Sequence, residues 1–173
     1  GELKQAVQWF EESLSIHESL LDSSEMYNVI HNLATTLGSL GKYDRSLELF
    51  EESASYYRNQ NSPWDLALAL GALASQYFNI GQYEKAKPLF EESLQVHRQL
   101  KDDYSILLTL NNMAAVLQHL DDLAEARRYF QETLALQEAH NWPHLLPHIL
   151  LNQAGLELNE GDYVEAKSVL QQT

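Results

Sequence analysis

The sequence of 173 residues contains no cysteine, only 11 lysine and arginine residues, and no long apolar run. The absence of cysteine excludes disulfides and thiol catalysis, and it is compatible with the cytoplasm, where we expect the protein to reside. Acidic residues number 25 and the net charge is −14, so binding to a phosphate backbone is disfavoured and nucleic acid is not an expected partner. No segment approaches the roughly 18 apolar residues of a membrane span, so no membrane association is expected.

Catalytic motifs are also lacking: there is no P-loop, no GxSxG and no HExxH. The best metal candidates are His140, His144 and His148, which are spaced by four residues. Asn141 and Pro143 should interrupt a helix between them, and the remaining histidine pair would be an incidental site. We therefore expect no enzyme, no cofactor and no functional metal site.

What the sequence does contain is a repeat of 40 residues. "FEESL" begins at Phe10 and again at Phe90, "FEESA" begins at Phe50, and "FQETL" begins at Phe130. A second block precedes each of the later copies, and both blocks carry apolar residues at spacings of three and four, which is typical of helices. We expect the phenylalanine to pack between helices, the serine to allow close approach, and the glutamates to face water on an outer, second helix.

A helix pair of this length cannot bury its apolar stripe alone, so neighbouring units must stack. The sequence therefore predicts an all-α solenoid of antiparallel helix pairs, with about nine helices in a single array over residues 1–173 that is a fragment of a longer one. The units are expected to turn at about residues 1, 41, 81, 121 and 161. Gly41, Gly81 and Gly161 should be left-handed at these turns, with Asp121 as a tolerable substitute.

Two segments read as helix starts. In "SPWD" at 62–65, the serine is a cap and the proline occupies the first helical position. "NWP" at 141–143 repeats this pattern, and Pro147 is then expected to bend the helix that follows.

The turns "GKYDRS", "GQYEKA" and "GDYVEA", with Phe50, Phe90 and Phe130 downstream, resemble tetratricopeptide repeats over essentially the whole chain. The 40-residue period exceeds the usual 34 and is closer to the kinesin light chain type, which also occurs in the sensor arrays of bacterial signalling ATPases. The family's signature tryptophan and glycine are replaced by aliphatic residues and alanine. The resemblance implies a right-handed superhelix that binds peptide segments of partner proteins in a concave groove lined by each unit's first helix.

The expected first helices are nearly uncharged. No lysine or arginine occurs in residues 27–40, 67–80, 107–120 or 147–160. Arrays that clamp a ligand carboxylate need basic residues there, so we predict that this chain is not such a clamp. Gln153 and Glu157 interrupt the apolar line of the last of these helices; either a continuation of the array or a ligand would satisfy them.

Asparagine recurs in these helices: Asn32, Asn112 and Asn152 occupy the same place in their units, and Ala72 breaks the series. Asparagine is a mediocre helix former, and its carboxamide offers the donor and the acceptor that a peptide backbone requires. We interpret the three residues as a ladder for the main chain of a ligand, the role that the resemblance also implies; the alternative is that each bonds a neighbouring helix. Further neutral contacts are expected from Asn28, His31, Thr35, Ser75, Asn111, Gln118, His119, His148 and Asn159.

The sequence thus predicts a non-catalytic interaction module that binds an extended, uncharged or mildly basic protein segment. The alternative is a sensor or spacer arm of a multidomain signalling ATPase that contacts its own chain. Exposed apolar faces on the terminal helices further predict end-to-end self-association.

Overall fold

The computed structural model describes residues 1–20 and 23–171, and all regular elements in this part of the chain are helices. They are α1 (Glu2–Leu20), α2 (Ser23–Ser39), α3 (Tyr43–Asn59), α4 (Pro63–Asn79), α5 (Tyr83–Leu100), α6 (Asp103–His119), α7 (Leu123–His140), α8 (Leu146–Glu160) and α9 (Tyr163–Leu170). The predicted all-α array of antiparallel helix pairs is confirmed. The helices fall into two compact units, Gly1–Gln82 and Tyr83–Thr173.

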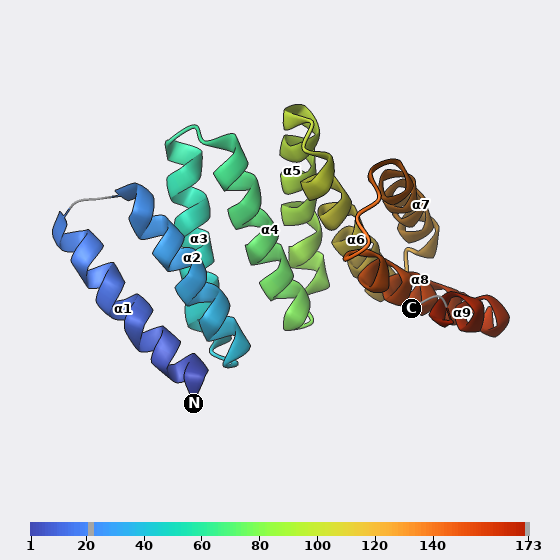
Figure 1. Ribbon diagram of the computed structural model, residues 1–173, viewed down its shortest axis with the longest axis horizontal. Coiled ribbons are helices and arrows are strands. Elements are labelled where there is room, and N and C mark those ends of the chain that lie inside the picture. Colours follow the sequence, from blue (N-terminus) through green and yellow to red (C-terminus); the bar gives the residue numbers. More distant parts are fainter. Residues whose placement is uncertain (21–22, 172–173) are drawn as a thin grey trace. The chain divides into compact units, whose positions relative to one another are not determined.

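In the first unit, α1 to α4 pack in order and alternate in direction (Figure 1). α2 also contacts α4, so the first helices of successive repeats form one layer. The interior between the helices is built from fully or almost fully buried aliphatic and aromatic residues, among them Leu33, Leu49, Phe50 and Leu70.

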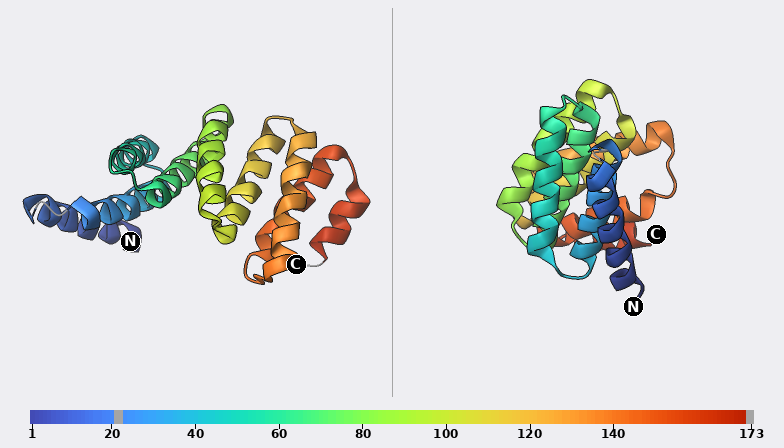
Figure 2. Two further views of the ribbon diagram at one scale, coloured as in Figure 1. Left: turned by 90° about the horizontal axis from the view of Figure 1, so that it is seen from above. Right: turned by 90° about the vertical axis from the view of Figure 1, so that its left-hand side faces the viewer.

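The second unit repeats this arrangement with α5 to α9, which can be followed from yellow-green to red in Figure 2. Here α6 contacts α8, again joining the first helices of successive repeats. α6 is the most buried helix, and Leu107, Leu110 and Met113 have no exposed surface.

The repeated pentapeptide packs as expected in its second to fourth copies. Phe50, Phe90 and Phe130 are each 2% exposed, and the small residue three positions later is buried in every case. The glutamates that lie between them are exposed or half-buried. Phenylalanine and serine therefore recur because they fill the helix interface, and the acidic pair recurs on the side that faces water.

A left-handed residue ends the helix at each of the turns between α2 and α9. Gly41, Gly81, Gly161 and Asp121 have positive φ, as predicted. The turns that lead from a second helix to the next repeat do the same with Asn61, Lys101 and Asn141, which the sequence did not reveal. A left-handed residue lets the following N–H reach back to a carbonyl of the last turn, so these positions end the helices at fixed points.

The start of α4 is predicted correctly, but the start of α8 is not. Ser62 is the N-cap of α4 and Pro63 is its first residue. α8 begins three residues after Pro143, at Leu146, because a helix started at Pro143 would place Pro147 where it lacks the N–H for a helical bond. In the observed helix Pro147 lies in the first turn, where proline is tolerated, and Leu145 is buried against Leu107.

No helix in the described part of the chain is long and apolar enough to cross a membrane.

Candidate functional site

The first helices present uncharged amides to solvent. Asn32 on α2 and Asn112 on α6 are exposed, and Asn152 on α8 is half-buried. None of the three carboxamides hydrogen-bonds another residue within 1–20 and 23–171. The donors and the acceptor of each carboxamide are therefore not engaged by other described residues.

The other predicted contacts divide by exposure. The exposed ones are Asn28, Thr35, His119, His148 and Asn159, and the half-buried ones are His31 and Ser75. The His31 ring meets the Phe50 ring edge-on at 5.4 Å, and its burial lowers the pKa of the imidazole. The His119 ring stacks on Tyr83 at 4.3 Å. Burial thus favours the neutral form of His31, and both rings are packed against aromatic neighbours.

Two of the predicted contacts have structural positions instead. Asn111 is 7% exposed, because it lies one residue, and so 100° of helical rotation, from the exposed Asn112. Gln118 lies between α6 and α8, where its Nε2 donates to the backbone oxygen of Asn152 at 3.2 Å. Gln118 thus has a partner within its unit, whereas the buried Oδ1 of Asn111 has no hydrogen-bond partner among the described residues.

Glu157 resolves the break in the apolar line of α8 in a way that the sequence did not suggest. Its carboxylate is 5% exposed and accepts from both terminal nitrogens of Arg127 on α7, at 2.9 and 3.2 Å. The partner is the preceding outer helix, not a ligand or a further repeat. The Glu157 charge is therefore neutralised within its own unit.

A groove of about 580 Å³ lies between α2 and α4 in the first unit. Its lining is wholly uncharged: Thr35, Gly38, Ser39, Tyr43, Phe50, Ala72, Ser75, Gln76 and Asn79. The residues of α4 recur at spacings of three and four, so they form one stripe facing α2. Two predicted contacts, Thr35 and Ser75, meet here, together with the alanine that breaks the asparagine series.

Gln76 and Gly38 are the functional candidates that sequence reasoning missed. Gln76 is 6% exposed, and its Nε2 is buried without a hydrogen-bond partner in the described part of the chain. A Cβ on Gly38 would lie 2.4 Å from the Gln76 Oε1, so a larger residue at position 38 would displace this amide from its observed position. The sequence contained one sign of this pair. Gly38 is a poor helix former near the end of α2, and Gln76 is a polar residue in the apolar stripe of α4.

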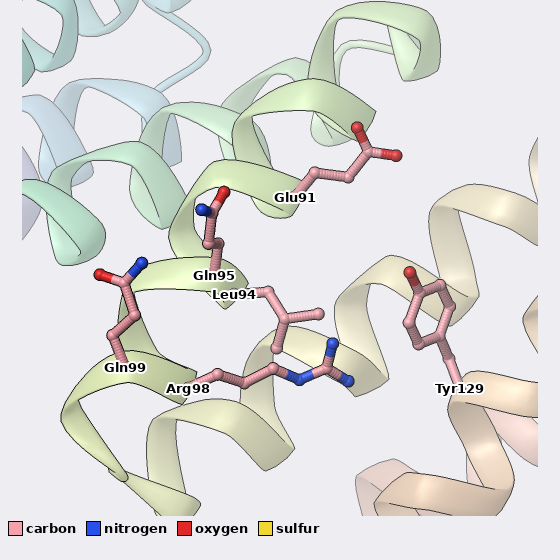
Figure 3. A pocket seen from close by; sticks show the side chains of 6 residues that line it. All are labelled: Glu91, Leu94, Gln95, Arg98, Gln99 and Tyr129. Carbon is pink, nitrogen blue, oxygen red and sulfur yellow. The ribbon is translucent and has the colours of Figure 1, made fainter.

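A second hollow, of about 490 Å³, lies on the second helices α5 and α7 (Figure 3). Leu94 and Arg98 of α5 face Tyr129 of α7 across it, and Glu91, Gln95 and Gln99 complete its lining. Arg98 is already engaged, since its guanidinium contacts Glu132 at 2.7 and 2.8 Å. This hollow is thus an ion-paired part of the outer surface, unlike the neutral groove.

No group of three or more histidine, cysteine or acidic residues with metal-binding geometry occurs among the described residues. The histidines near the end of α7 have separate partners. His140 lies 2.8 Å from Asp103 and stacks on Trp142, whereas His144 lies 3.4 Å from the Tyr104 hydroxyl. They are not brought together around a common point.

Stacked antiparallel helix pairs with a 40-residue period define a helical-repeat protein. Residues 28–59 and 65–139, together more than half of the chain, match family models described as tetratricopeptide repeat. The chain belongs to this family, whose arrays are generally non-catalytic scaffolds for protein–protein interaction. A search of curated proteins found no match.

Several solved structures share the fold. BtubC (BKLC) from P. vanneervenii is 18% identical, with a TM-score of 0.85 over 99% of this chain and 72% of that one. The nearly identical TPR-like repeats of a kinesin light chain protein from Podosopora anserina are 21% identical, with a TM-score of 0.81 over 99% and 85%. A Rap protein complexed with competence and sporulation factor is 19% identical, with a TM-score of 0.84; this chain is covered to 99% and spans 48% of that protein. At such identities the likeness concerns the fold alone.

Proposed function

We propose that this chain is a cytoplasmic interaction module that binds an extended, uncharged or mildly basic segment of a partner protein along its first helices. The observation that carries the proposal is the set of unpaired carboxamides at Asn32, Asn112 and Asn152. A carboxamide can donate to a ligand carbonyl and accept from a ligand N–H, so it holds a peptide main chain without selecting its side chains. The Rap protein of similar fold, complexed with competence and sporulation factor, supports a binding role for such a repeat array.

The uncharged surroundings define the ligand further. Neither the asparagine-bearing faces nor the groove between α2 and α4 offers a lysine or arginine, so a ligand carboxylate would lose its water without gaining a partner. The excess of acidic residues elsewhere, which gives a net charge of −14, favours approach by segments with basic flanks.

The test is a random-peptide display selection against the chain, with binding of the enriched peptides compared between the parent and the variant Asn32→Ala/Asn112→Ala/Asn152→Ala. Each lost hydrogen bond weakens binding by about 0.5–1.5 kcal/mol, so the variant should bind about tenfold more weakly or worse. Circular dichroism should show an unchanged helix content.

A matched control removes three exposed carboxamides from the second helices, in Asn59→Ala/Gln95→Ala/Gln131→Ala. It should bind like the parent. Enrichment of no peptide, or equal binding by parent and asparagine variant, contradicts the proposal and favours an arm of a multidomain signalling ATPase that contacts its own chain.

A further inference from the structure

The groove between α2 and α4 contains two features that are locally unfavourable and that depend on each other. Gly38 lies within α2, where glycine weakens a helix, and the Nε2 of Gln76 on α4 is buried without a hydrogen-bond partner among the described residues. The observed position of the Gln76 amide requires that residue 38 lack a Cβ. A buried donor that lines an open groove is a site prepared for an acceptor from outside.

The second unit contains the same pair of residue types in a satisfied form. Between α6 and α8, the Gln118 Oε1 lies 3.2 Å from the place of a Cβ on Gly155, and its Nε2 donates to the Asn152 backbone oxygen at 3.2 Å. There, a carboxamide lies between two first helices and is hydrogen-bonded. Between α2 and α4 the glycine and the glutamine stand on the opposite helices of the pair, and the Gln76 amide nitrogen has no acceptor among the described residues.

The remaining groups of the groove specify what else the ligand needs. The hydroxyls of Thr35, Ser39 and Ser75 each donate to a backbone carbonyl of their own helix, at 2.9, 3.1 and 2.8 Å. Their oxygens therefore face the groove's occupant as acceptors, not donors. A fitting group accepts one hydrogen bond, from Gln76, and donates to a hydroxyl oxygen.

Charged groups do not meet this requirement. A carboxylate accepts but cannot donate, and an ammonium donates but finds no acid in the lining. The position of Ala72, which stands where the other repeats have asparagine, keeps the groove open beside Gln76.

We propose that the groove between α2 and α4 binds the carboxamide side chain of a glutamine or asparagine in the ligand, with its oxygen on Gln76 Nε2 and its nitrogen on a hydroxyl oxygen of the lining. The proposal rests on the proposed peptide-binding function and adds a side-chain preference to it. The asparagines hold the ligand main chain, and this groove selects one residue.

The test uses small probes that do not need the asparagine ladder. The ¹⁵N-labelled chain is titrated with the N-acetyl methylamides of glutamine, glutamate, methionine and lysine, and the side-chain amide resonance of Gln76 is followed. All four probes carry the same backbone amides, so the methionine probe separates side-chain recognition from backbone recognition. The glutamine probe should shift the Gln76 signal with an affinity about tenfold above the others, the factor that a well-made hydrogen-bond pair supplies.

Two variants close the groove in different ways. Gly38→Ala displaces the Gln76 amide and Ala72→Asn fills the space beside it, so each should abolish the response to the glutamine probe. Gly155→Ala, the matched helical glycine of the second unit, should leave the response unchanged. Equal shifts with all four probes, no shift, or an unchanged response in Gly38→Ala each overturn the proposal.

The asparagine triple variant distinguishes this proposal from the one on which it rests. It should keep the full response to the glutamine probe while losing selected peptides. If peptides bind through the asparagines but the groove shows no preference for glutamine, the binding module stands and the side-chain pocket does not.

Discussion

Lys101 occupies the least favourable backbone conformation for its residue type in the described chain, and replacing it with glycine should stabilise the second unit. Its φ is 55°, in the left-handed region. The conformation is required, because the next residue, Asp102, donates its N–H to the His97 carbonyl at 3.1 Å and then caps α6 by accepting from Ser105 N at 3.1 Å. The turn thus ends α5 and begins α6, although its left-handed conformation is unfavourable for Lys101.

The size of the effect follows from two opposing terms. A left-handed backbone costs a residue with a Cβ about 1–2 kcal/mol. Glycine avoids that cost but loses about 0.5–1 kcal/mol through the greater freedom of the unfolded chain. We expect Lys101→Gly to raise the free energy of unfolding by about 0.5–1 kcal/mol. The urea concentration at the midpoint should rise by roughly a few tenths molar.

The assay must report on the second unit alone, because repeat arrays need not unfold in one step. Trp142 is the tryptophan of that unit, so the background Trp9→Phe/Trp64→Phe leaves a single fluorescence probe in it. Gln95→Gly is the control: the residue is exposed in the middle of α5, and its replacement should destabilise by about 1 kcal/mol. If Lys101→Gly also destabilises, the turn is not left-handed and the reasoning fails.

Three further predictions concern charge and exposed surface. Arg127→Met leaves the Glu157 carboxylate buried and unpaired and should lower the free energy of unfolding in urea by about 2 kcal/mol. The loss is smaller than for a fully buried pair because Arg127 is 41% exposed. Adding Glu157→Gln should recover most of it. Burial lowers the pKa of His97, although the nearby Asp102 carboxylate opposes the shift, so the unfolded state binds the proton more readily. Stability should therefore be complete above about pH 6.5 and fall as the pH drops below it, and His97→Gln should reduce this slope whereas exposed His148→Gln should not. Trp9 is 66% exposed on α1, and light scattering should detect concentration-dependent association that Trp9→Glu abolishes; a strict monomer at high concentration argues against it.

The helices and their turns could be predicted because the repeat states each feature several times. Phe50, Phe90 and Phe130 each indicate a buried position at the helix interface. Three glycines and Asp121 each indicate a left-handed turn. An accidental pattern would not recur at one period. These features could be predicted because they recur in several repeats, not because any single residue gives a strong signal.

Features that occur once were missed. The start of α8 depends on Pro147 and on burial of Leu145, and neither has a counterpart in another repeat. The pairing of Glu157 with Arg127 joins two helices, and only the fold shows which side chains face each other. The burial of Asn111 beside the exposed Asn112 depends on the rotation of α6, which a pattern of polar residues does not fix to within one position.

The two units also differ in whether the buried glutamine amide between their first helices is hydrogen-bonded, and this bears on how a ligand would be recognised. Between α2 and α4, a buried amide without a partner costs about 1–3 kcal/mol, against the 5–15 kcal/mol of net stability of a typical domain. Between α6 and α8, the Gln118 amide makes its hydrogen bond, so this cost does not arise there. The buried amide nitrogen of Gln76, like the buried carboxamide oxygens of Asn111 and Gln137, has no partner among the described residues, and a ligand in the groove would supply one for Gln76. Side-chain selection is therefore expected at Gln76, and main-chain binding at the exposed asparagines of both units.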